Sequence, residues 1–313
     1  MQAVVTGGAG FIGSHIVDRL VAEGHEVRVL DNLTTGMASQ VHPEADLVVA
    51  DLLDTPALAE VLRGADVVFH QAAARSVLAS VLDPLATDLA NTHGTLALLM
   101  AALDAGVRRI VAASSSSIYG GADVVPTTED QPLRPRSPYA VSKLAGEHYC
   151  RVYAELHGLE TVVLRYFNVF GPRQRPDSAY AAVIPLFIDA LLQDRRPQVH
   201  GDGLQTRDFT FIDDTVSANV AAARAPAQVC SGRAYNIAGG GSISLIDLLG
   251  HLGRLTGVTP RPIHIEARAG DVRRSQAAIG AAGRDLAFFP QVGIEVGLSQ
   301  TVDWARVGRP PRF

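Results

Sequence analysis

Short apolar runs alternate with stretches of helical periodicity along the first half of the chain. Apolar runs at residues 3–5, 27–30, 47–49, 67–69 and 109–113 predict strands. Between them, apolar side chains recur at three- and four-residue spacing, which predicts helices at about 12–21, 56–63 and 83–105. This alternation predicts an α/β fold whose sheet is parallel and doubly wound, with helices on both faces. Ligands of such sheets bind at the carboxyl ends of the strands.

The first strand runs into a glycine-rich turn, Thr6-Gly7-Gly8-Ala9-Gly10-Phe11-Ile12-Gly13, and a helix follows it. Gly7 permits the tight turn, Gly10 lets the backbone approach a pyrophosphate, and Gly13 lets the helix pack on the strand. The helix N-terminus then directs its amide groups at the anion. Asp31, at the end of the second strand, can accept hydrogen bonds from both ribose hydroxyls and would repel a 2′-phosphate. These features predict a Rossmann-type sheet that binds NAD rather than NADP.

The pattern changes after residue 166. The stretch at 207–214 has strand alternation that ends in a helix cap, and another strand is predicted at 234–237. Helices are predicted at about 183–193 and 244–256. Such mixed elements suit a smaller α/β domain that faces the sheet edge across a cleft. We therefore expect an NAD-binding domain at 1–166 with a return segment at about 208–240, and a substrate-binding domain made of 167–207 and 241–313.

Candidate catalytic side chains follow the strand at 109–113. Serines occupy positions 114–117, and Tyr139 and Lys143 lie four residues apart in the next predicted helix. Residues at that spacing share a helix face, so the phenol and the ammonium can address one ligand. Lowering the pKa of a tyrosine from about 10 to near neutrality takes roughly 4 kcal/mol of preferential stabilisation of the phenolate. The lysine and a positive nicotinamide ring can supply it, while one of the serines hydrogen-bonds the same substrate oxygen.

Composition narrows the class of partner. The 313 residues carry 27 basic and 32 acidic side chains, a net charge of −5, which argues against nucleic acid or a membrane as the main partner. No apolar run approaches the roughly 20 residues of a membrane span, and the first strand lacks the basic flank of a signal peptide, so we expect a cytoplasmic protein. Cys150 and Cys230 are expected to be reduced and packed. His70 has no further ligand at metal-binding spacing, and no metal site is expected.

In combination, these motifs resemble the extended short-chain dehydrogenase/reductases. The motifs are the glycine turn with Asp31-Asn32, Asn91-Thr92-His93-Gly94-Thr95, Ser114 to Gly120, Tyr139 to Lys143 and Arg165-Tyr166-Phe167-Asn168. Within that family the chain is most similar to the nucleotide-sugar 4-epimerases of the UDP-galactose and UDP-N-acetylglucosamine type, and the likeness runs nearly end to end. The resemblance implies NAD as the cofactor and a UDP-sugar as the substrate.

By the same resemblance, Tyr139 is the base on the sugar 4-hydroxyl, Lys143 binds the nicotinamide ribose, and Ser115 is the third catalytic residue. Asp51 corresponds to the adenine-contacting aspartate, and Asn91 supports the active-site helix. The implied cofactor-binding residues are Gly7, Gly10, Phe11, Ile12, Gly13, Asp31, Asn32, Asp51, Leu52, Gln71, Ala72, Ala73, Arg75, Asn91, Tyr139, Lys143 and Phe167. The implied substrate-binding residues are Ser115, Ser116, Ser117, Tyr139, Asn168, Arg175, Val183, Arg207, Arg268, Asp271 and Ser275.

Four positions bear on the reaction and on the sugar. The related 4,6-dehydratases and uronate decarboxylases carry an acid directly after the catalytic Ser or Thr, and Ser116 stands there in this chain. Ser275 resembles members that accept N-acetylated sugars, because hexose-only members have a tyrosine at that position. Arg175, with Ser116 and Ser117, resembles the uronate epimerases, which leaves UDP-glucuronate as a second candidate. A TDP-sugar and an NAD-binding sensor without catalysis also remain open.

Apolar positions along the helix predicted at 83–105 and along the Tyr139 helix suit a four-helix bundle between two subunits, as relatives have. The same side chains could equally be buried within one subunit. We expect a homodimer. The leucines of the first helix are Leu85, Leu89, Leu96, Leu99 and Leu103.

Overall fold

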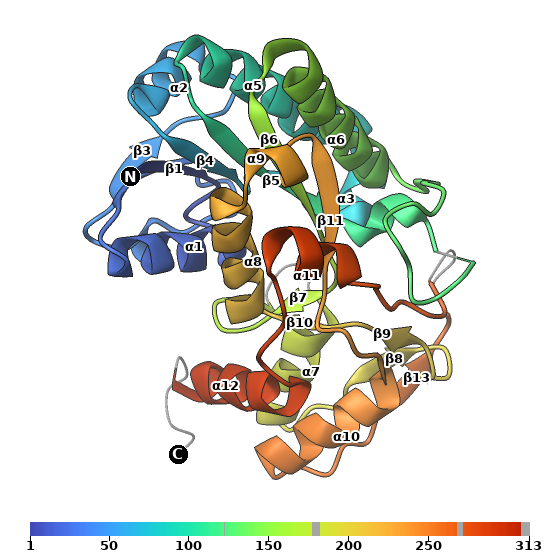
Figure 1. Ribbon diagram of the computed structural model, residues 1–313. Helices are drawn as coiled ribbons and strands as arrows, with labels where there is room; N and C mark the ends of the chain where they lie inside the picture. Colours follow the sequence, from blue (N-terminus) through green and yellow to red (C-terminus); the bar gives the residue numbers. More distant parts are fainter. Residues whose placement is uncertain (122, 177–181, 268–271, 308–313) are drawn as a thin grey trace.

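A seven-stranded parallel sheet forms the centre of the molecule (Figure 1). The computed structural model describes residues 1–121, 123–176, 182–267 and 272–307. The strand order is β11-β6-β5-β4-β1-β2-β3, and all neighbours are parallel. The doubly wound α/β fold is thus confirmed, and its order reverses beside β1, where such sheets bind ligands. The strands are β1 (Gln2–Thr6), β2 (Glu26–Asp31), β3 (Asp46–Val49), β4 (Val67–His70), β5 (Arg109–Ser115), β6 (Glu160–Tyr166) and β11 (Arg233–Ile237).

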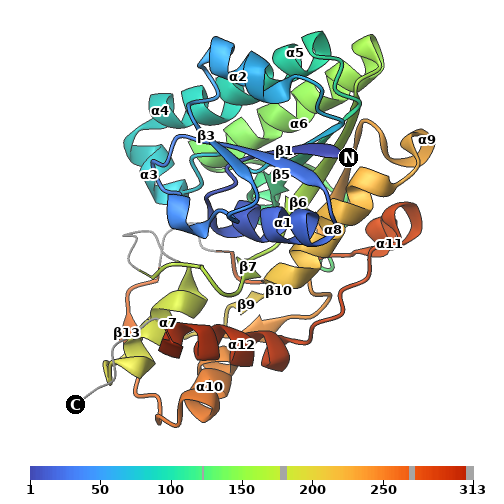
Figure 2. The same cartoon turned by 90° about the vertical axis from the view of Figure 1, so that its left-hand side faces the viewer.

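Helices cover both faces of this sheet (Figure 2). One face carries α1 (Phe11–Ala22) and α8 (Ile212–Arg224), and the other carries α2 (Thr55–Leu62), α5 (Gly94–Asp104) and α6 (Pro138–His157). Side chains alternate along the strands accordingly. Ala3 and Val5 pack in the apolar core beneath α1 and α8, whereas Val4 packs in the core beneath α2 and α5. All three are fully buried, as expected for a sheet that is covered on both sides.

The helix predicted at 83–105 begins and ends where expected and contains a π-helical turn. It consists of α4 (Pro84–Asp88), the π-helical turn at Leu89–His93, and α5, and a further short helix, α3 (Val77–Leu82), precedes it. Asp83 separates α3 from α4, and its carboxylate caps α4 by accepting from the Ala86 N–H at 3.0 Å. Pro84 then stands at the first position of α4, where its missing N–H costs nothing. Periodicity alone did not reveal α3 or the π-helical turn.

Shorter elements lie beyond the carboxyl edge of the sheet. They include three two-stranded sheets, and α7, α10 and α12 pack on one another. The expected division into an NAD-binding and a substrate-binding domain stays a prediction. Helix α11 falls within the expected substrate-binding domain, yet it packs on β11 and α8 of the expected NAD-binding domain. The elements beyond this edge are β7 (Val169–Phe170), α7 (Val183–Leu192), β8 (Gln198–His200), β9 (Thr206–Arg207), β10 (Thr210–Phe211), β12 (Ile243–Ser244), α10 (Leu245–Thr256), β13 (Ile263–Ile265) and α12 (Ile294–Val307). Helix α9 (Ala227–Cys230) instead contacts β6 and α11 (Gly280–Leu286), away from that edge.

The helix cap predicted near residue 213 is wrong. α8 begins directly after Phe211 without a side-chain cap, and Asp213 and Asp214 lie within its first turn. The Asp214 carboxylate instead accepts hydrogen bonds from the N–H groups of Gln291 and Val292, at 2.8 and 3.1 Å. It therefore ties the chain before α12 to α8. Among the described residues, the helices all fall short of the length and apolar character needed to cross a membrane.

Candidate active site

The glycine turn joins β1 to α1 and presses against the chain that follows β4. Gly7 has a φ of +71°, and a Cβ there would lie 2.6 Å from the Ala72 nitrogen. A Cβ on Gly13 would lie 2.2 Å from the Gly7 carbonyl oxygen, so the helix can sit this close only with glycine. The tight turn and the close helix packing expected from the sequence are therefore present. No side chain caps α1 at Gly10, which leaves its first N–H groups open to an anion.

Carboxylates lie at the ends of β2 and just beyond β3. Asp31 accepts hydrogen bonds from the N–H groups of Ala9 in the glycine turn (3.0 Å) and Leu33 (2.8 Å). Asp51 accepts from the side-chain amide of Asn32 at 2.8 Å, so the two predicted adenosine contacts lie together. Leu52 is buried beside them. The carboxylates of Asp31 and Asp51 thus lie beside the closely held glycine turn. This arrangement of hydrogen-bond acceptors suits the ribose and adenine of NAD.

The end of β4 is held by a buried histidine. His70 is hydrogen-bonded through Nδ1 to Thr6 Oγ1 (2.8 Å) and through Nε2 to Thr95 Oγ1 (2.9 Å). Burial, and to a lesser degree the charge of Lys143, lowers the pKa of His70 to about 3, so the ring is neutral. The sequence interpretation of His70 as a packed residue is confirmed. Gln71, next in the chain, donates to Tyr166 and Asn219, at 3.2 Å each.

Residues 71–76 are irregular, and helix α3 begins only after Ser76. Asn91, in the π-helical turn, holds this segment by accepting from the Ala74 N–H (2.7 Å) and donating to the Ala74 carbonyl (3.0 Å). The same amide donates to Ser142 Oγ of α6 at 2.9 Å. Ala72 and Ala73 are half-buried and Arg75 is exposed. Asn91 therefore braces both the loop after β4 and the helix that carries Tyr139.

Tyr139 and Ser115 meet across the carboxyl end of β5. Tyr139 lies in the first turn of α6, which Ser137 caps by accepting from the Ala140 N–H at 3.1 Å. Burial raises the pKa of Tyr139, while a hydrogen bond with the Ser115 side chain and the positive charge of Arg75 oppose that rise. Without a ligand the phenol therefore keeps its proton. A base role requires further positive charge beside it.

Lys143 lies one helical turn after Tyr139. Its Nζ donates to the carbonyl oxygen of Ala113 on β5, at 3.0 Å. Burial lowers the pKa of Lys143 to about 8, so at neutral pH the ammonium is mostly retained. The Oγ of Ser117 is buried and has no hydrogen-bond partner among the described residues. Together with Ser115 and Ser116, it forms a row of hydroxyls at the end of β5.

A buried ionic network beneath this site was missed in the sequence. Arg165 and Glu147 form an ion pair (Nη2 to Oε2, 2.8 Å), and Ser114 donates to Glu147 at 2.5 Å. Arg165 also donates to the Tyr119 hydroxyl at 2.7 Å. Burial raises the pKa of Tyr119 to about 12. The available signal was that Glu147 lies four residues after Lys143, on the helix face that meets the sheet.

The remaining predicted substrate residues come from the part of the chain that follows β6. The side-chain amide of Asn168 donates to the Asp208 carbonyl (3.0 Å), and Arg207 donates to the Val272 carbonyl (2.6 Å). Ser275 is half-buried, and its N–H donates to the Thr206 carbonyl at 3.1 Å. Phe167 is buried. Val183 begins α7, Arg175 lies in the preceding loop, and Arg268 and Asp271 lie outside the described residues.

Arg173 and Arg273 are both held in ion pairs. Arg173 pairs with Asp18 of α1 at 2.6 Å, and Arg273 pairs with Asp202 through two contacts of 2.7 and 2.8 Å. Within the described ranges, no three His, Cys, Asp or Glu side chains gather as a metal site would require. Cys150 and Cys230 are free and buried.

Fold and site together define a dinucleotide-binding α/β enzyme with a Ser-Tyr-Lys group at a strand end. The chain belongs to the NAD dependent epimerase/dehydratase family, whose pattern matches residues 3–238. The resemblance to extended short-chain dehydrogenase/reductases and the expected NAD cofactor are thereby confirmed.

Named relatives span nearly the whole chain. A UDP-glucose 4-epimerase of Mycolicibacterium smegmatis is 41% identical over 317 aligned residues, covering 98% of this chain and 99% of the relative. The crystal structure of a Thermotoga maritima UDP-glucose 4-epimerase with UDP-glucose is 35% identical, with a TM-score of 0.94 and coverage of 98% and 99%. A UDP-N-acetylglucosamine 4-epimerase of Methanobrevibacter ruminantium, in complex with UDP-N-acetylmuramic acid, is 36% identical with the same TM-score and coverage.

Proposed function

We propose that the protein catalyses the NAD-dependent 4-epimerisation of a UDP-sugar through a transient 4-keto intermediate. The observation that carries the proposal is the hydrogen bond between Ser115 and Tyr139, with Lys143 one turn away on the same helix. This arrangement supplies a proton acceptor and a donor to one substrate oxygen. The 4-epimerases among the relatives support the reaction type.

The residues of the chain fit a dinucleotide. The α1 N-terminus is free of side-chain caps, the turn before it is closely held by Gly7 and Gly13, and Asp31 lies beside it. NAD, when bound, takes up and returns the hydride of sugar C4 and brings positive charge to the site. We assign the Gly7–Gly13 turn to the pyrophosphate, Asp31 and Asp51 to the adenosine, and Lys143 to the nicotinamide ribose.

Tyr139 accepts the proton of the sugar 4-hydroxyl and later returns it to the epimeric hydroxyl. Ser115 hydrogen-bonds the same oxygen, and the Lys143 ammonium favours the phenolate. Both side chains are anchored, Ser115 at the end of β5 and Lys143 through its bond to Ala113. Asn168 and Arg207, with Arg268 and Asp271, hold the UDP portion in this proposal. Binding energy from that unreactive part keeps the keto sugar in place while it turns.

For the sugar, we propose UDP-N-acetylglucosamine, UDP-glucose or both, with their 4-epimers as products. Ser275 has a small side chain. By the family resemblance, hexose-only 4-epimerases have a tyrosine at this position. Ser116 puts a hydroxyl where dehydratases need a carboxylate, which disfavours dehydration. One observation favours UDP-glucuronate as a second candidate, since the buried Ser117 Oγ, without a partner in the described part of the chain, can donate to a carboxylate.

We further propose a homodimer and a cytoplasmic location. Helices α3 and α4 expose several large apolar side chains, and both pack beside α6, which exposes Val141, Val152 and Leu156 among polar residues. Exposure is highest at Val81 (61%), Leu82 (77%), Leu85 (76%) and Leu156 (74%), which is unusual for a surface facing only water. Two unpaired buried cysteines suit a reducing compartment. Sedimentation showing only monomer at micromolar concentration would remove the dimer.

The decisive experiment uses the purified protein without added cofactor. It is incubated separately with UDP-N-acetylglucosamine, UDP-glucose and UDP-glucuronate, and the sugar stereochemistry is followed by proton NMR. Conversion of the first two to their 4-epimers is the expected result. Conversion of glucuronate alone assigns specificity to Arg175, Ser116 and Ser117. No conversion of any of them, even with NAD supplied, overturns the proposed UDP-sugar activity and directs the search to TDP-sugars.

A further inference from the structure

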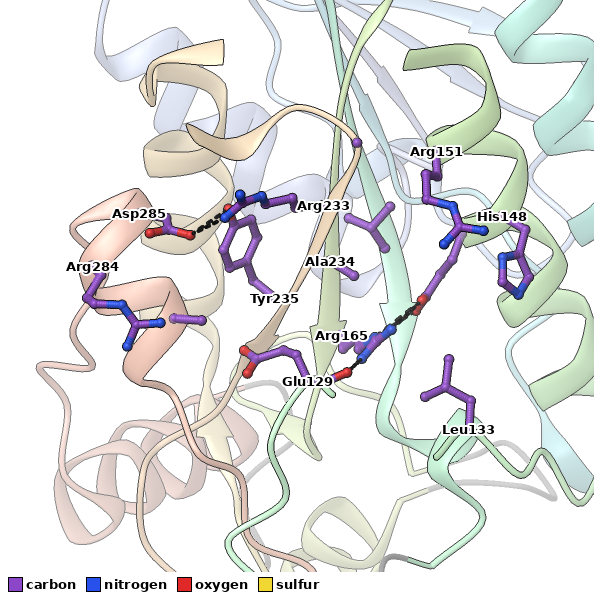
Figure 3. A pocket seen from close by; sticks show the side chains of 14 residues that line it. Glu129, Leu133, His148, Arg151, Arg165, Arg233, Ala234, Tyr235, Arg284 and Asp285 are labelled. Carbon is purple, nitrogen blue, oxygen red and sulfur yellow. Dashed lines mark hydrogen bonds and ion pairs between the residues drawn. The ribbon is translucent and has the colours of Figure 1, made fainter. Parts of the chain in front are cut away.

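A second pocket lies at the far edge of the sheet, away from the glycine turn and Tyr139. It has a volume of about 350 Å³ and opens between α6 and α11, over the edge strand β11 (Figure 3). Its floor is apolar, with Leu133, Val163 and Ala234. The size falls within the range of small-molecule sites. None of the residues assigned above to NAD or to the UDP-sugar lines it.

The described residues that line this pocket include more arginines than carboxylates. Arg165 and Glu147 pair at its base (2.8 Å), and Arg233 pairs with Asp285 at its rim (3.3 Å). Two arginines remain, and they come from opposite walls: Arg151 from α6 and Arg284 from α11 (Figure 3). Glu129 is the one further carboxylate among the described lining residues.

Both remaining arginines can bind a ligand. Arg284 is exposed and has no hydrogen bond or ion pair with any described residue. Arg151 contacts Glu155 only at 3.8 Å, with 56% and 65% of the two side chains exposed, and such a pair is worth little. One oxygen of the half-buried Glu129 carboxylate accepts from the Asn236 N–H at 2.9 Å. Glu129 therefore stays in place as an acceptor on the pocket wall.

We infer that this pocket is a second ligand site, for a small phosphate monoester that carries hydroxyl groups. A phosphate monoester has a charge between about −1.5 and −2 near neutral pH, which matches the two arginines, and guanidinium groups bind phosphate oxygens in pairs. Hydroxyl groups at the other end of the ligand donate to Glu129, while its carbon skeleton lies on the apolar floor. A dicarboxylate ligand fits less well. One of its carboxylates would bind the arginines, but the other would face the Glu129 carboxylate, and both groups are acceptors without a hydrogen to share.

The base of the pocket connects it to the catalytic strand. Glu147 accepts from Ser114, the neighbour of Ser115, and Arg165 donates to Tyr119, which follows the serine row. An occupant that shifts this ion pair therefore alters the strand end that carries Ser115. This consequence rests on the proposed function, whereas the site itself does not, so binding is measured first.

The test is calorimetric titration of the full chain with glucose 6-phosphate while the main cleft is saturated with NAD and UDP. Inorganic phosphate and glucose are titrated for comparison. Arg284→Ala and Arg151→Ala each remove a charged contact and are expected to weaken glucose 6-phosphate binding about tenfold or more. Arg254→Ala, at an exposed arginine of helix α10 that lies outside the pocket lining, is the matched control and should change nothing. Ala281→Trp fills the pocket without changing its charge and should abolish binding, with thermal melting as the check on folding.

The expected result is one glucose 6-phosphate per chain, weaker binding of inorganic phosphate, and none of glucose. Absence of binding up to ~10 mM overturns the inference, because a site for a cellular metabolite must bind within that range. Binding that survives unchanged in Arg284→Ala, Arg151→Ala and Ala281→Trp also overturns it, since the ligand then lies elsewhere. The epimerase assay is independent of these outcomes, so a failure of the proposed function leaves the binding result interpretable.

Discussion

Arg165 and Glu147 form an ion pair beneath the catalytic strand, with only 6% and 7% of their side chains exposed. Arg165→Met leaves the Glu147 carboxylate buried without its counter-charge, at an expected cost of about 3–5 kcal/mol in the free energy of unfolding. Arg108→Met is the matched control, because Arg108 is 53% exposed and pairs with Glu160 at 3.2 Å. That control should lose at most about 1 kcal/mol. Urea unfolding followed by circular dichroism measures both, and equal losses would show that the buried pair is not a special contributor.

Tyr139→Phe removes the proposed base while leaving the ring in place. Turnover of the UDP-sugar is expected to fall by about 10²–10⁴-fold, the range of a general acid–base group, with NAD still bound. Tyr149→Phe, on the same helix, should keep turnover within a factor of two or so, because Tyr149 packs beside the apolar core between α5 and α6 rather than at the strand end. The proton NMR assay gives turnover, and absorbance after denaturation gives bound NAD. Full activity of Tyr139→Phe would exclude the proposed base.

The sequence predicted the parallel sheet and the grouping of Tyr139 with the serines because these depend on local signals. Period-two and helical patterns, the glycine turn and a four-residue spacing are all visible within one segment. The Arg165–Glu147 pair joins a strand to a helix, and its register exists only after the sheet has formed. Helix α3 was missed for a different reason, since its six residues, Val77–Leu82, are too few to show a clear helical period. The cap expected near Asp213 failed because the chain enters α8 through Phe211 without a side-chain acceptor.

His70 should make the protein sensitive to acid. The pKa of the buried ring is about 3, below the 6.5 of an exposed histidine, so between these values the unfolded chain binds a proton that the folded chain does not. Stability is therefore lost as pH falls through this window, by about 2 kcal/mol between pH 7 and pH 5. In urea unfolding over the same pH interval, the free energy of unfolding of His70→Gln should fall by about 2 kcal/mol less than that of the wild type. His157→Gln, at an exposed helix position, is the control and should follow the wild type. Parallel pH curves for wild type and His70→Gln would contradict the prediction.

Gly13→Ala tests the close packing of α1 on the glycine turn. The added methyl would lie 2.2 Å from the Gly7 carbonyl oxygen, so the turn must move, at an expected cost of about 1–3 kcal/mol and with loss of bound NAD. Gly250→Ala in α10 is the matched control, because the nearest atom lies 4.0 Å away at the end of the flexible Arg254 side chain. That substitution should raise stability by about 0.5–1 kcal/mol, since alanine favours a helix over glycine. Retention of NAD by Gly13→Ala would show that the turn adapts.

Ser275→Tyr tests the proposed sugar specificity at a position that the backbone already fixes. The N–H of Ser275 donates to the Thr206 carbonyl, and the Thr206 N–H donates to the Arg273 carbonyl. Residues 273–275 therefore lie along β9, and a new side chain cannot move away with the main chain. A tyrosine fills space beside the proposed sugar pocket. An N-acetyl group needs that space, and a hydroxyl group does not. Turnover of UDP-N-acetylglucosamine should therefore fall by about tenfold to a hundredfold relative to UDP-glucose, the discrimination that steric fit supplies in a pocket. Ser275→Ala keeps the space and should leave the ratio of the two kcat/KM values near that of the wild type. An unchanged ratio in Ser275→Tyr would place the N-acetyl group elsewhere in the cleft.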